Sequence, residues 1–300
     1  MKKYNLWEED LKFAKEITNQ YAKSFSAGIK LFPKDIRNAT YSIYLFVRLP
    51  DNIIDETTLS ENDAKIELTN WINNWNHYYY HNTFPNPAFR LMKQTMEDYN
   101  IPKYLVDDFF TAMIADTNKN RYHSYQELKD YMHGSAAVIG EMMAIILGAD
   151  KKDIPAARAL GEAFQLTNFL RDIKEDYKIR NRIYIPNNIL IKYNCSHNNI
   201  EQQNLSPEFI EAIKYIINYN KTLYNFARTG INSLNPKTQF GIILATNIYE
   251  AILNKIEKEN YNIFKKRIHT KTIDKIIIFG KTKYNYIKNK PKKKYLYSSR

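Results

Sequence analysis

The stretch QLTNFLRDIKED, residues 165–176, is the part of the chain that decides its fold class. Asn168, Asp172 and Asp176 recur every four residues, which places their oxygen atoms on successive turns of one helix face. The apolar residues between them predict that the rest of this helix is buried: Leu166, Phe169, Leu170 and Ile173. Glu175 adds one more oxygen donor beside this face. Burying unpaired carboxylates is costly, and a bound metal cluster would remove that cost.

A second acidic pair lies in RLPDNIIDE, residues 48–56. Asp51 and Asp55 are four residues apart, so on a helix their Cβ atoms lie about 6 Å apart on one face. Two hard oxygen ligands on one face suit Mg²⁺, which keeps several waters and bridges to substrate phosphates. This pair therefore predicts a second half of a magnesium site.

Each acidic pair is accompanied by an arginine. Arg48 precedes Asp51 by three residues, and Arg171 directly precedes Asp172. Arginine binds phosphate oxygens bidentately and keeps its charge. A single Asp-x-x-x-Asp is more often a solvated helix face with surface ion pairs. Two such pairs in apolar helices, each with an arginine, favour a site for metal and diphosphate together.

The rest of the chain shows helical rather than alternating periodicity, only eight glycines and no internal repeat. No composition change marks a linker, so the sequence predicts one all-α domain. Two start signals stand out, Ser124 with Glu127 as a capping box and Ser206 followed by Pro207. We expect an irregular segment over 186–205 and helices over 7–21, 33–55, 88–99, 103–118, 124–148, 155–177, 206–233, 240–259 and 271–279.

Composition excludes several classes of protein. The single cysteine, Cys195, excludes an intrachain disulfide and a cysteine-based zinc cluster. No stretch reaches the ~20 apolar residues of a membrane span, so we expect a cytoplasmic protein, soluble or peripherally membrane-associated. His77 and His81 are four apart but have no third ligand nearby, so we interpret them as a helix end rather than a zinc site.

The positive charge of the chain is concentrated at its C-terminal end. Residues 261–300 hold eleven Lys and two Arg against one acid, Asp274, which equals the formal net charge of +12 of the whole chain. We expect residues 281–300 to be a disordered basic tail. It would serve either as a solubilising end or in contact with an anionic membrane. No folded motif supports binding to a specific nucleic acid.

These motifs, in this order, resemble the squalene/phytoene synthase family over residues 10–275. Asn181 stands where the family usually has Gly, before Arg-x-Tyr, and Asn is the next most tolerant residue of a left-handed backbone. The matching segments are KSFSAGIKLFP (23–33), YLFVRLPDNIID (44–55), SYQELKDYMHGSAAVIGEMM (124–143), GEAFQLTNFLRDIKED (161–176), RIYIP (182–186) and IYEAILNKIEKENYNIFKKR (248–267).

The resemblance implies a single isoprenoid-synthase-type bundle of α-helices around a central cavity, here residues 1–280, with Mg²⁺ or alternatively Mn²⁺ as cofactor. It implies metal ligands at Asp51, Asp55, Asn168, Asp172 and Asp176. It implies catalytic roles for these four aspartates and for Tyr44, Arg48, Arg171 and Tyr249. It implies substrate contacts from Ser24, Phe25, Arg48, Gln165, Asn168, Arg171, Arg182, Tyr249 and Arg267.

The implied reaction is the head-to-head condensation of two prenyl diphosphates through a cyclopropylcarbinyl diphosphate. The wording GSAAVIGEMM is closer to microbial phytoene synthases, so we favour two geranylgeranyl diphosphates giving phytoene for carotenoid biosynthesis, without NADPH. Squalene or dehydrosqualene formation from farnesyl diphosphate is the alternative. A catalytically inactive assembly or membrane adaptor is a third, and the four intact aspartates argue against it.

The allylic cation of such a reaction needs a dry pocket lined by aromatic rings. The candidates for this lining are Tyr44, Phe46, Phe164 and Phe169. Ala136, Gly140 and Ala144 form a stripe of small residues four apart. The stripe fits either close packing of two helices or room for a long isoprenoid tail.

Overall fold

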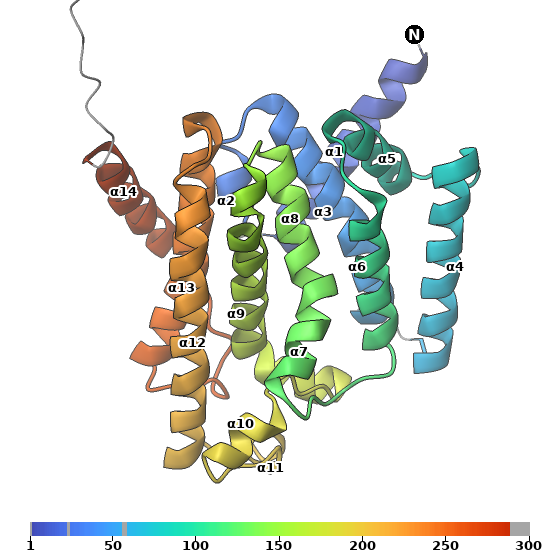
Figure 1. The fold of residues 1–300 in the computed structure, drawn as a ribbon. Coiled ribbons are helices and arrows are strands. Elements are labelled where there is room, and N and C mark those ends of the chain that lie inside the picture. The colour runs from blue at the N-terminus through green and yellow to red at the C-terminus, as the bar shows by residue number, and fades with distance from the viewer. Residues whose placement is uncertain (1, 23–24, 56–58, 289–300) are drawn as a thin grey trace, which may run out of the picture.

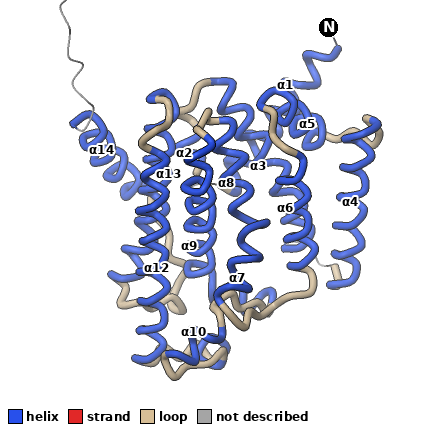
Figure 2. The backbone as a smooth tube through the Cα atoms, viewed as in Figure 1, coloured by secondary structure: helices blue, strands red, loops and turns tan. Residues whose placement is uncertain are grey.

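The computed structural model describes residues 2–22, 25–55 and 59–288, with side chains from residue 7. Within these ranges every long element is a helix (Figure 1), and Figure 2 shows no strand. Only a single bridge pairs Arg121 with Ile183 in the described part of the chain. The expected all-α fold is confirmed.

The N-terminal half packs its helices around an aromatic core. Phe46 contacts Trp71, Trp75 and Phe89, with ring centroids 4.6–6.4 Å apart. These rings bury large apolar areas and hold the outer helices against the helix that carries Asp51 and Asp55. The helices of this half are α1 (Lys2–Tyr21), α2 (Ser26–Ile29), α3 (Lys34–Asp55), α4 (Glu61–His81), α5 (Pro87–Tyr99) and α6 (Lys103–Asp116).

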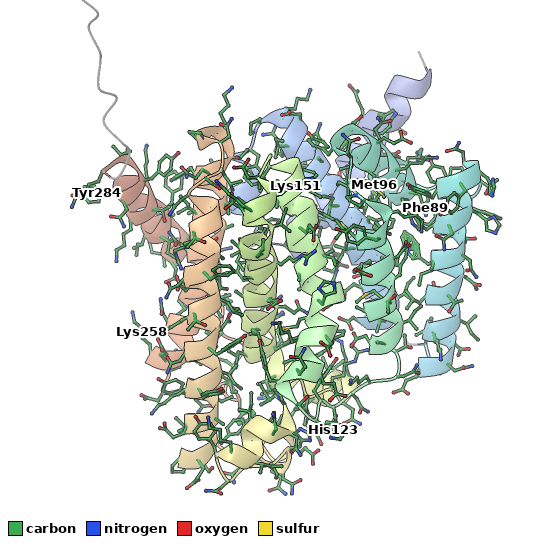
Figure 3. All side chains as sticks on the ribbon, viewed as in Figure 1. Phe89, Met96, His123, Lys151, Lys258 and Tyr284 are labelled. Atoms are coloured by element: carbon green, nitrogen blue, oxygen red, sulfur yellow. The ribbon has the colours of Figure 1, made fainter. Side chains whose placement is uncertain are left out.

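The C-terminal half is organised around one long central helix, α9 (Ile154–Arg180), which packs on α8 (Val138–Ile146), α12 and α13. Their side chains project from the ribbon on all sides of the bundle (Figure 3). Because α9 is central, the carboxylates it carries are held by neighbours on several sides. The remaining elements are α10 (Asn187–Lys192), α11 (Asn198–Glu201), α12 (Pro207–Ile231), α13 (Pro236–Lys258), α14 (Thr272–Lys288) and a 3₁₀ turn, η2 (Lys151–Asp153).

The predicted start signals are confirmed. The Ser206 hydroxyl accepts a hydrogen bond from the Phe209 N–H at 3.2 Å, and Pro207 is the first residue of α12. The Ser124 hydroxyl likewise accepts from the Glu127 N–H at 3.2 Å. Such caps satisfy N–H groups that have no partner inside the helix.

The helix expected over 124–148 is not continuous. It divides into α7 (Tyr125–Met132), a π-helical turn η1 (His133–Ala137) and α8 (Val138–Ile146). Gly134 lies so close to α6 that an added Cβ would be 2.5 Å from the Asp108 carbonyl oxygen. The extra residue of the π turn lets the chain shift its face at this contact, which periodicity alone does not reveal.

Two expectations about the C-terminal region are wrong. The segment 186–205 contains two short helices, α10 and α11. The basic segment forms α14, which continues to Lys288, so residues 281–288 are helical rather than a disordered tail. Side-chain contacts with α13 explain the extension, since Asn247 Nδ2 donates to the Thr282 hydroxyl at 2.9 Å and Phe240 contacts Phe279. Residues 289–300 of the expected tail lie outside the described residues.

No helix among the described residues is both long and apolar enough to cross a membrane.

Candidate active site

A central cavity of ≈ 960 Å³ lies between the helices of the two halves. Its wall includes side chains from α3, α8, α9, α12 and α13, and its volume is at the upper end of the ~300–1,000 Å³ typical of small-molecule sites. Asp51, Asp55, Asp172 and Asp176 all line this one cavity. The expectation of a bundle around a central cavity is therefore confirmed.

The first acidic pair lies at the end of α3. Arg48 donates to Asp51 at 2.5 Å, one helical turn away, and its guanidinium lies 4.1 Å from the ring centre of Tyr21. Stacking on an aromatic face fixes the plane of a guanidinium. Arg48 and Asp51 thus form one positioned unit at the cavity wall.

The second acidic pair lies on the cavity side of α9. Asp172 accepts bidentate hydrogen bonds from Arg171 at 2.8 and 2.5 Å. It also accepts from Arg267, which follows α13, at 2.7 and 3.1 Å. Two guanidinium groups from distant parts of the sequence therefore meet on one carboxylate, as is typical of a site that binds phosphate oxygens.

One guanidinium shows directly that the two acidic faces meet. Arg180 Nε lies 3.1 Å from an Asp55 oxygen, and Arg180 Nη1 donates to an Asp176 oxygen at 3.0 Å. A single planar group can reach both carboxylates only if α3 and α9 present them toward each other. The predicted pairs 51/55 and 172/176 thus form one site.

The turn after α9 places Arg182 against two carboxylates of this site. Asn181 caps the helix in the left-handed conformation with φ 51°, as expected for an Asn in place of Gly. The Arg182 N–H bonds the Asp176 carbonyl oxygen at 3.0 Å, which reverses the chain. Arg182 Nη1 then lies 3.0 Å from Asp55 and 3.2 Å from the buried carboxylate of Asp116.

The carboxylates of the site differ in their affinity for protons. Burial, with the nearby charge of Asp55, raises the pKa of Asp51 to about 7, although 36% of its side chain is open to the cavity. Burial, with the charge of Asp172, raises the pKa of Asp176 to about 8. Burial opposes ionisation of Asp172 as well, but its bonds to Arg171 and Arg267 outweigh burial and lower its pKa. The positive charge near Asp51 and Asp176 is therefore too small to offset the effect of burial on their pKa values.

The donor set fits Mg²⁺. The Asn168 Oδ1 atom is buried and has no hydrogen-bond partner among the described residues, although it belongs to a cavity-lining side chain. An amide oxygen together with carboxylate oxygens is the set of ligands that a hard cation prefers. No three His, Cys, Asp or Glu side chains among the described residues form a preformed metal-binding cluster. Arginines contact the carboxylates of Asp55 and Asp172 instead.

Aromatic side chains cover part of the cavity wall beyond the charged groups. Phe164 stacks on Tyr249 with centroids 4.3 Å apart and meets Phe25 edge-on at 6.4 Å. Phe169 stacks on Tyr184 at 3.9 Å. Rings in this arrangement exclude water and offer π faces to a cation.

One predicted lining residue is wrong. Phe46 is fully buried in the aromatic core with Trp75 and does not line the cavity, whereas Tyr44 does. Residues two apart on a helix face different directions, so Tyr44 and Phe46 cannot both face the cavity.

Residues 18–274 match the family model of squalene/phytoene synthase, which is most of the chain. The chain belongs to the squalene/phytoene synthase family. Similar family members include a 15-cis-phytoene synthase of Synechocystis sp., 29% identical over 90% of this chain and 83% of that protein. A phytoene synthase of Arthrospira platensis is 26% identical over 90% of this chain and 91% of that protein.

Solved structures place the chain in the same fold. A dehydrosqualene synthase superposes with a TM-score of 0.86 at 20% identity, covering 95% of this chain and 99% of that one. The squalene synthase HpnC from Alicyclobacillus acidocaldarius gives a TM-score of 0.76 at 24% identity, covering 85% of this chain and 96% of that one. The isoprenoid-synthase-type bundle expected of a squalene/phytoene synthase is thus confirmed.

The structure brings most of the residues predicted from the sequence motifs and the family resemblance to this cavity. Those lining it are Phe25, Tyr44, Arg48, Asp51, Asp55, Gln165, Asn168, Arg171, Asp172, Glu175, Asp176, Tyr249 and Arg267. Arg182 does not line it and lies behind Asp55, between this residue and Asp116. Ser24 lies outside the described residues.

Sequence reasoning missed several polar cavity residues, among them Asp116, Tyr131, Arg180 and Tyr184. Arg180 follows Asp176 by four residues, a spacing that could have indicated the pair. Asp116 ends the apolar helix α6, and burial raises its pKa to about 6. An acid at the end of an otherwise apolar helix was the available signal for this residue.

Proposed function

We propose that this chain is a Mg²⁺-dependent prenyltransferase that condenses two geranylgeranyl diphosphates head to head into 15-cis-phytoene, by way of a cyclopropylcarbinyl diphosphate. The observation that carries the proposal is the single guanidinium of Arg180, which contacts Asp55 and Asp176 at one apolar cavity. Two facing carboxylate walls suit the binding of metal and diphosphate between them. Mn²⁺ is expected to substitute for Mg²⁺.

Asp51, Asp55, Asn168, Asp172 and Asp176 would hold the metal ions. When bound, Mg²⁺ supplies positive charge that neutralises the pyrophosphate leaving group. Arg48, Arg171 and Arg267 already lie at the cavity wall with their guanidinium groups on carboxylates. With those carboxylates serving as metal ligands, the three guanidinium groups would be available for phosphate oxygens, where they would stabilise the developing negative charge.

The aromatic part of the wall would handle the carbocation. Burial raises the pKa of both Tyr44 and Tyr249, so both phenols stay neutral at physiological pH. Neutral rings stabilise an allylic cation through their π faces without capturing it as a phenolate would. Phe164 stacked on Tyr249 keeps this side of the cavity dry, which protects the cation from water.

The twenty-carbon substrate is supported by the similar phytoene synthases. Formation of phytoene consumes no reductant, so we expect no NADPH requirement. We propose that the enzyme acts in the cytoplasm and is recruited to membranes, where its hydrocarbon product would partition.

Purified protein incubated with geranylgeranyl or farnesyl diphosphate, with Mg²⁺ and with or without NADPH, tests the proposal. The expected result is phytoene and pyrophosphate from the twenty-carbon substrate, independent of NADPH. Squalene or dehydrosqualene from farnesyl diphosphate alone would instead establish the fifteen-carbon alternative. No product from either, and no thermal stabilisation by Mg²⁺ with an unreactive prenyl thiodiphosphate, would favour the inactive adaptor.

A further inference from the structure

An apolar stripe runs along the outer face of α14. Five apolar residues share this side of the helix, because successive members are one, three or seven residues apart in the sequence: Ile273, Ile276, Ile277, Tyr284 and Ile287. They are 50–66% exposed, so no described segment covers them. Gly280 falls inside the same stripe, and nothing lies within 4 Å of where its Cβ would be. Single exposed apolar residues are ordinary, but a contiguous stripe of five is not.

The opposite face of α14 is already occupied. Thr282 is buried and accepts from Asn247 of α13, while Phe279 and Tyr286 contact Phe240 of α13. In Figure 1, α14 lies on the outside of the bundle beside α13. Tyr284 lies on the side of α14 that faces away from the other helices (Figure 3). The helix is therefore held by the domain through one face and presents the other outward.

Lysines border this apolar stripe on both sides. At about 100° per residue, Lys281 and Lys288 fall at one edge and Lys283 at the other. All three are exposed. The only acid of the helix, Asp274, is paired with Lys255 of α13. The residues that follow, 289–300, add four Lys and one Arg and no acid.

The helix also adjoins the cavity. Lys275, on the inward side of α14, lines the cavity together with Arg267, His269 and Thr270. The outward apolar face and the cavity wall are thus two sides of the same short element. A surface that binds α14 from outside would lie beside this part of the cavity wall.

We propose that α14 docks this protein onto an anionic phospholipid bilayer, with the Ile273–Ile287 stripe in the interface and the bordering lysines at the headgroups. Amphipathic helices with lysines at the edges of an apolar face lie in the plane of the interface in this way. Each basic residue near such a surface adds attraction to anionic lipid. The proposal rests on the proposed function in one respect only: docking would let the enzyme exchange isoprenoid substrate and product with the membrane.

Cosedimentation of the full-length protein with vesicles tests the proposal without any substrate. One set of vesicles is phosphatidylcholine with a third phosphatidylglycerol, and the other is phosphatidylcholine alone. The wild-type protein should sediment with the anionic vesicles, and added salt should weaken this binding. Ile277→Ser with Ile287→Ser should reduce the partition coefficient about tenfold or more, because two apolar side chains leave the interface. Lys281→Gln with Lys283→Gln should reduce it mainly for anionic vesicles.

The matched control is Ile66→Ser with Ile191→Ser, two similarly exposed isoleucines on α4 and α10. This variant should bind vesicles like the wild type. Thermal unfolding should be nearly unchanged in all three variants, since the altered side chains are exposed. Failure of the wild type to bind, or equal losses in the α14 and control variants, would overturn the proposal. So would a wild-type dimer in solution that the α14 isoleucine variant dissociates while vesicle binding persists.

Discussion

At the scale of single residues, Asp51 and Asp172 represent two kinds of carboxylate in one cavity. Asp51 has one arginine and a raised pKa, whereas Asp172 has two arginines and a lowered one. We expect Asp51→Asn and Asp172→Asn each to lower kcat about a thousandfold or more, because each removes a metal-binding oxygen charge. Steady-state kinetics with the prenyl diphosphate substrate gives the measurement.

Both variants should keep the far-ultraviolet circular dichroism spectrum and cooperative unfolding of the wild type. The matched control is Glu67→Gln, which alters an exposed acid on α4 away from the cavity and should leave kcat unchanged. Near wild-type turnover by either aspartate variant would remove that residue from the catalytic site.

The raised pKa values of Asp51 and Asp176, about 7 and about 8, predict how stability depends on pH. Between the ordinary aspartate pKa and these values, the folded protein holds more protons than the unfolded chain. The free energy of unfolding from these two groups therefore falls as pH rises from about 4 to about 8. In Asp176→Asn the metal-free protein should lose less stability over this interval than the wild type does.

Denaturant unfolding of the metal-free protein at pH 5.5 and pH 8 measures this difference. Mg²⁺ with pyrophosphate should stabilise the wild type more at pH 8 than at pH 5.5, since metal ligands must lose their protons first. Identical pH dependence in the wild type and in Asp176→Asn would show that the Asp176 carboxyl titrates normally.

At the scale of elements, the glycines of the small-residue stripe and its partner helix set the distance between α9 and the segment formed by η1 and α8. A Cβ on Gly140 would lie 2.3 Å from the Ala157 carbonyl oxygen, and one on Gly161 would lie 2.3 Å from the Ala136 carbonyl oxygen. Both obstacles are backbone atoms, which cannot rotate away. Close packing therefore accounts for Gly140, and all three members of the stripe also line the cavity.

We expect Gly161→Ala to lower the free energy of unfolding by about 1–3 kcal/mol through this overpacking. Gly280→Ala is the matched control on α14, where the added methyl meets nothing within 4 Å. It should be neutral or stabilise the protein by up to about 1 kcal/mol, because Ala is the better helix former. Urea denaturation of the two variants measures both changes. Equal effects would mean that α9 and η1 can separate without cost.

Local sequence predicted the helix caps but not the π turn or the end of α14. Ser124, Ser206 and Asn181 act within a few residues of themselves, so their capping roles were readable from the sequence. The π turn η1 was not, because it depends on how closely Gly134 approaches α6. The continuation of α14 to Lys288 likewise depends on contacts with Phe240 and Asn247 of another helix.

At the scale of the whole molecule, the two acidic faces were predictable separately and their meeting was implied only by the family resemblance. The spacing of four residues between the acids of each helix predicted each acidic face. The bridge from Arg180 to Asp55 joins residues 125 positions apart, which no local pattern contains. Asp116 and Tyr184 were missed for the same reason, whereas Phe46 could have been excluded from its two-residue distance to Tyr44.

The proposed function requires α3 and α9 to hold metal ions and diphosphate between their acidic faces. Anomalous diffraction from crystals grown with Mn²⁺ and an unreactive geranylgeranyl thiodiphosphate tests it most directly. We expect Mn²⁺ peaks at both acidic faces, with the diphosphate between them. The ligands should be Asp51 or Asp55 on α3, and Asn168, Asp172 or Asp176 on α9. Mn²⁺ and diphosphate bound together elsewhere, with Arg180 still joining Asp55 to Asp176, would contradict it.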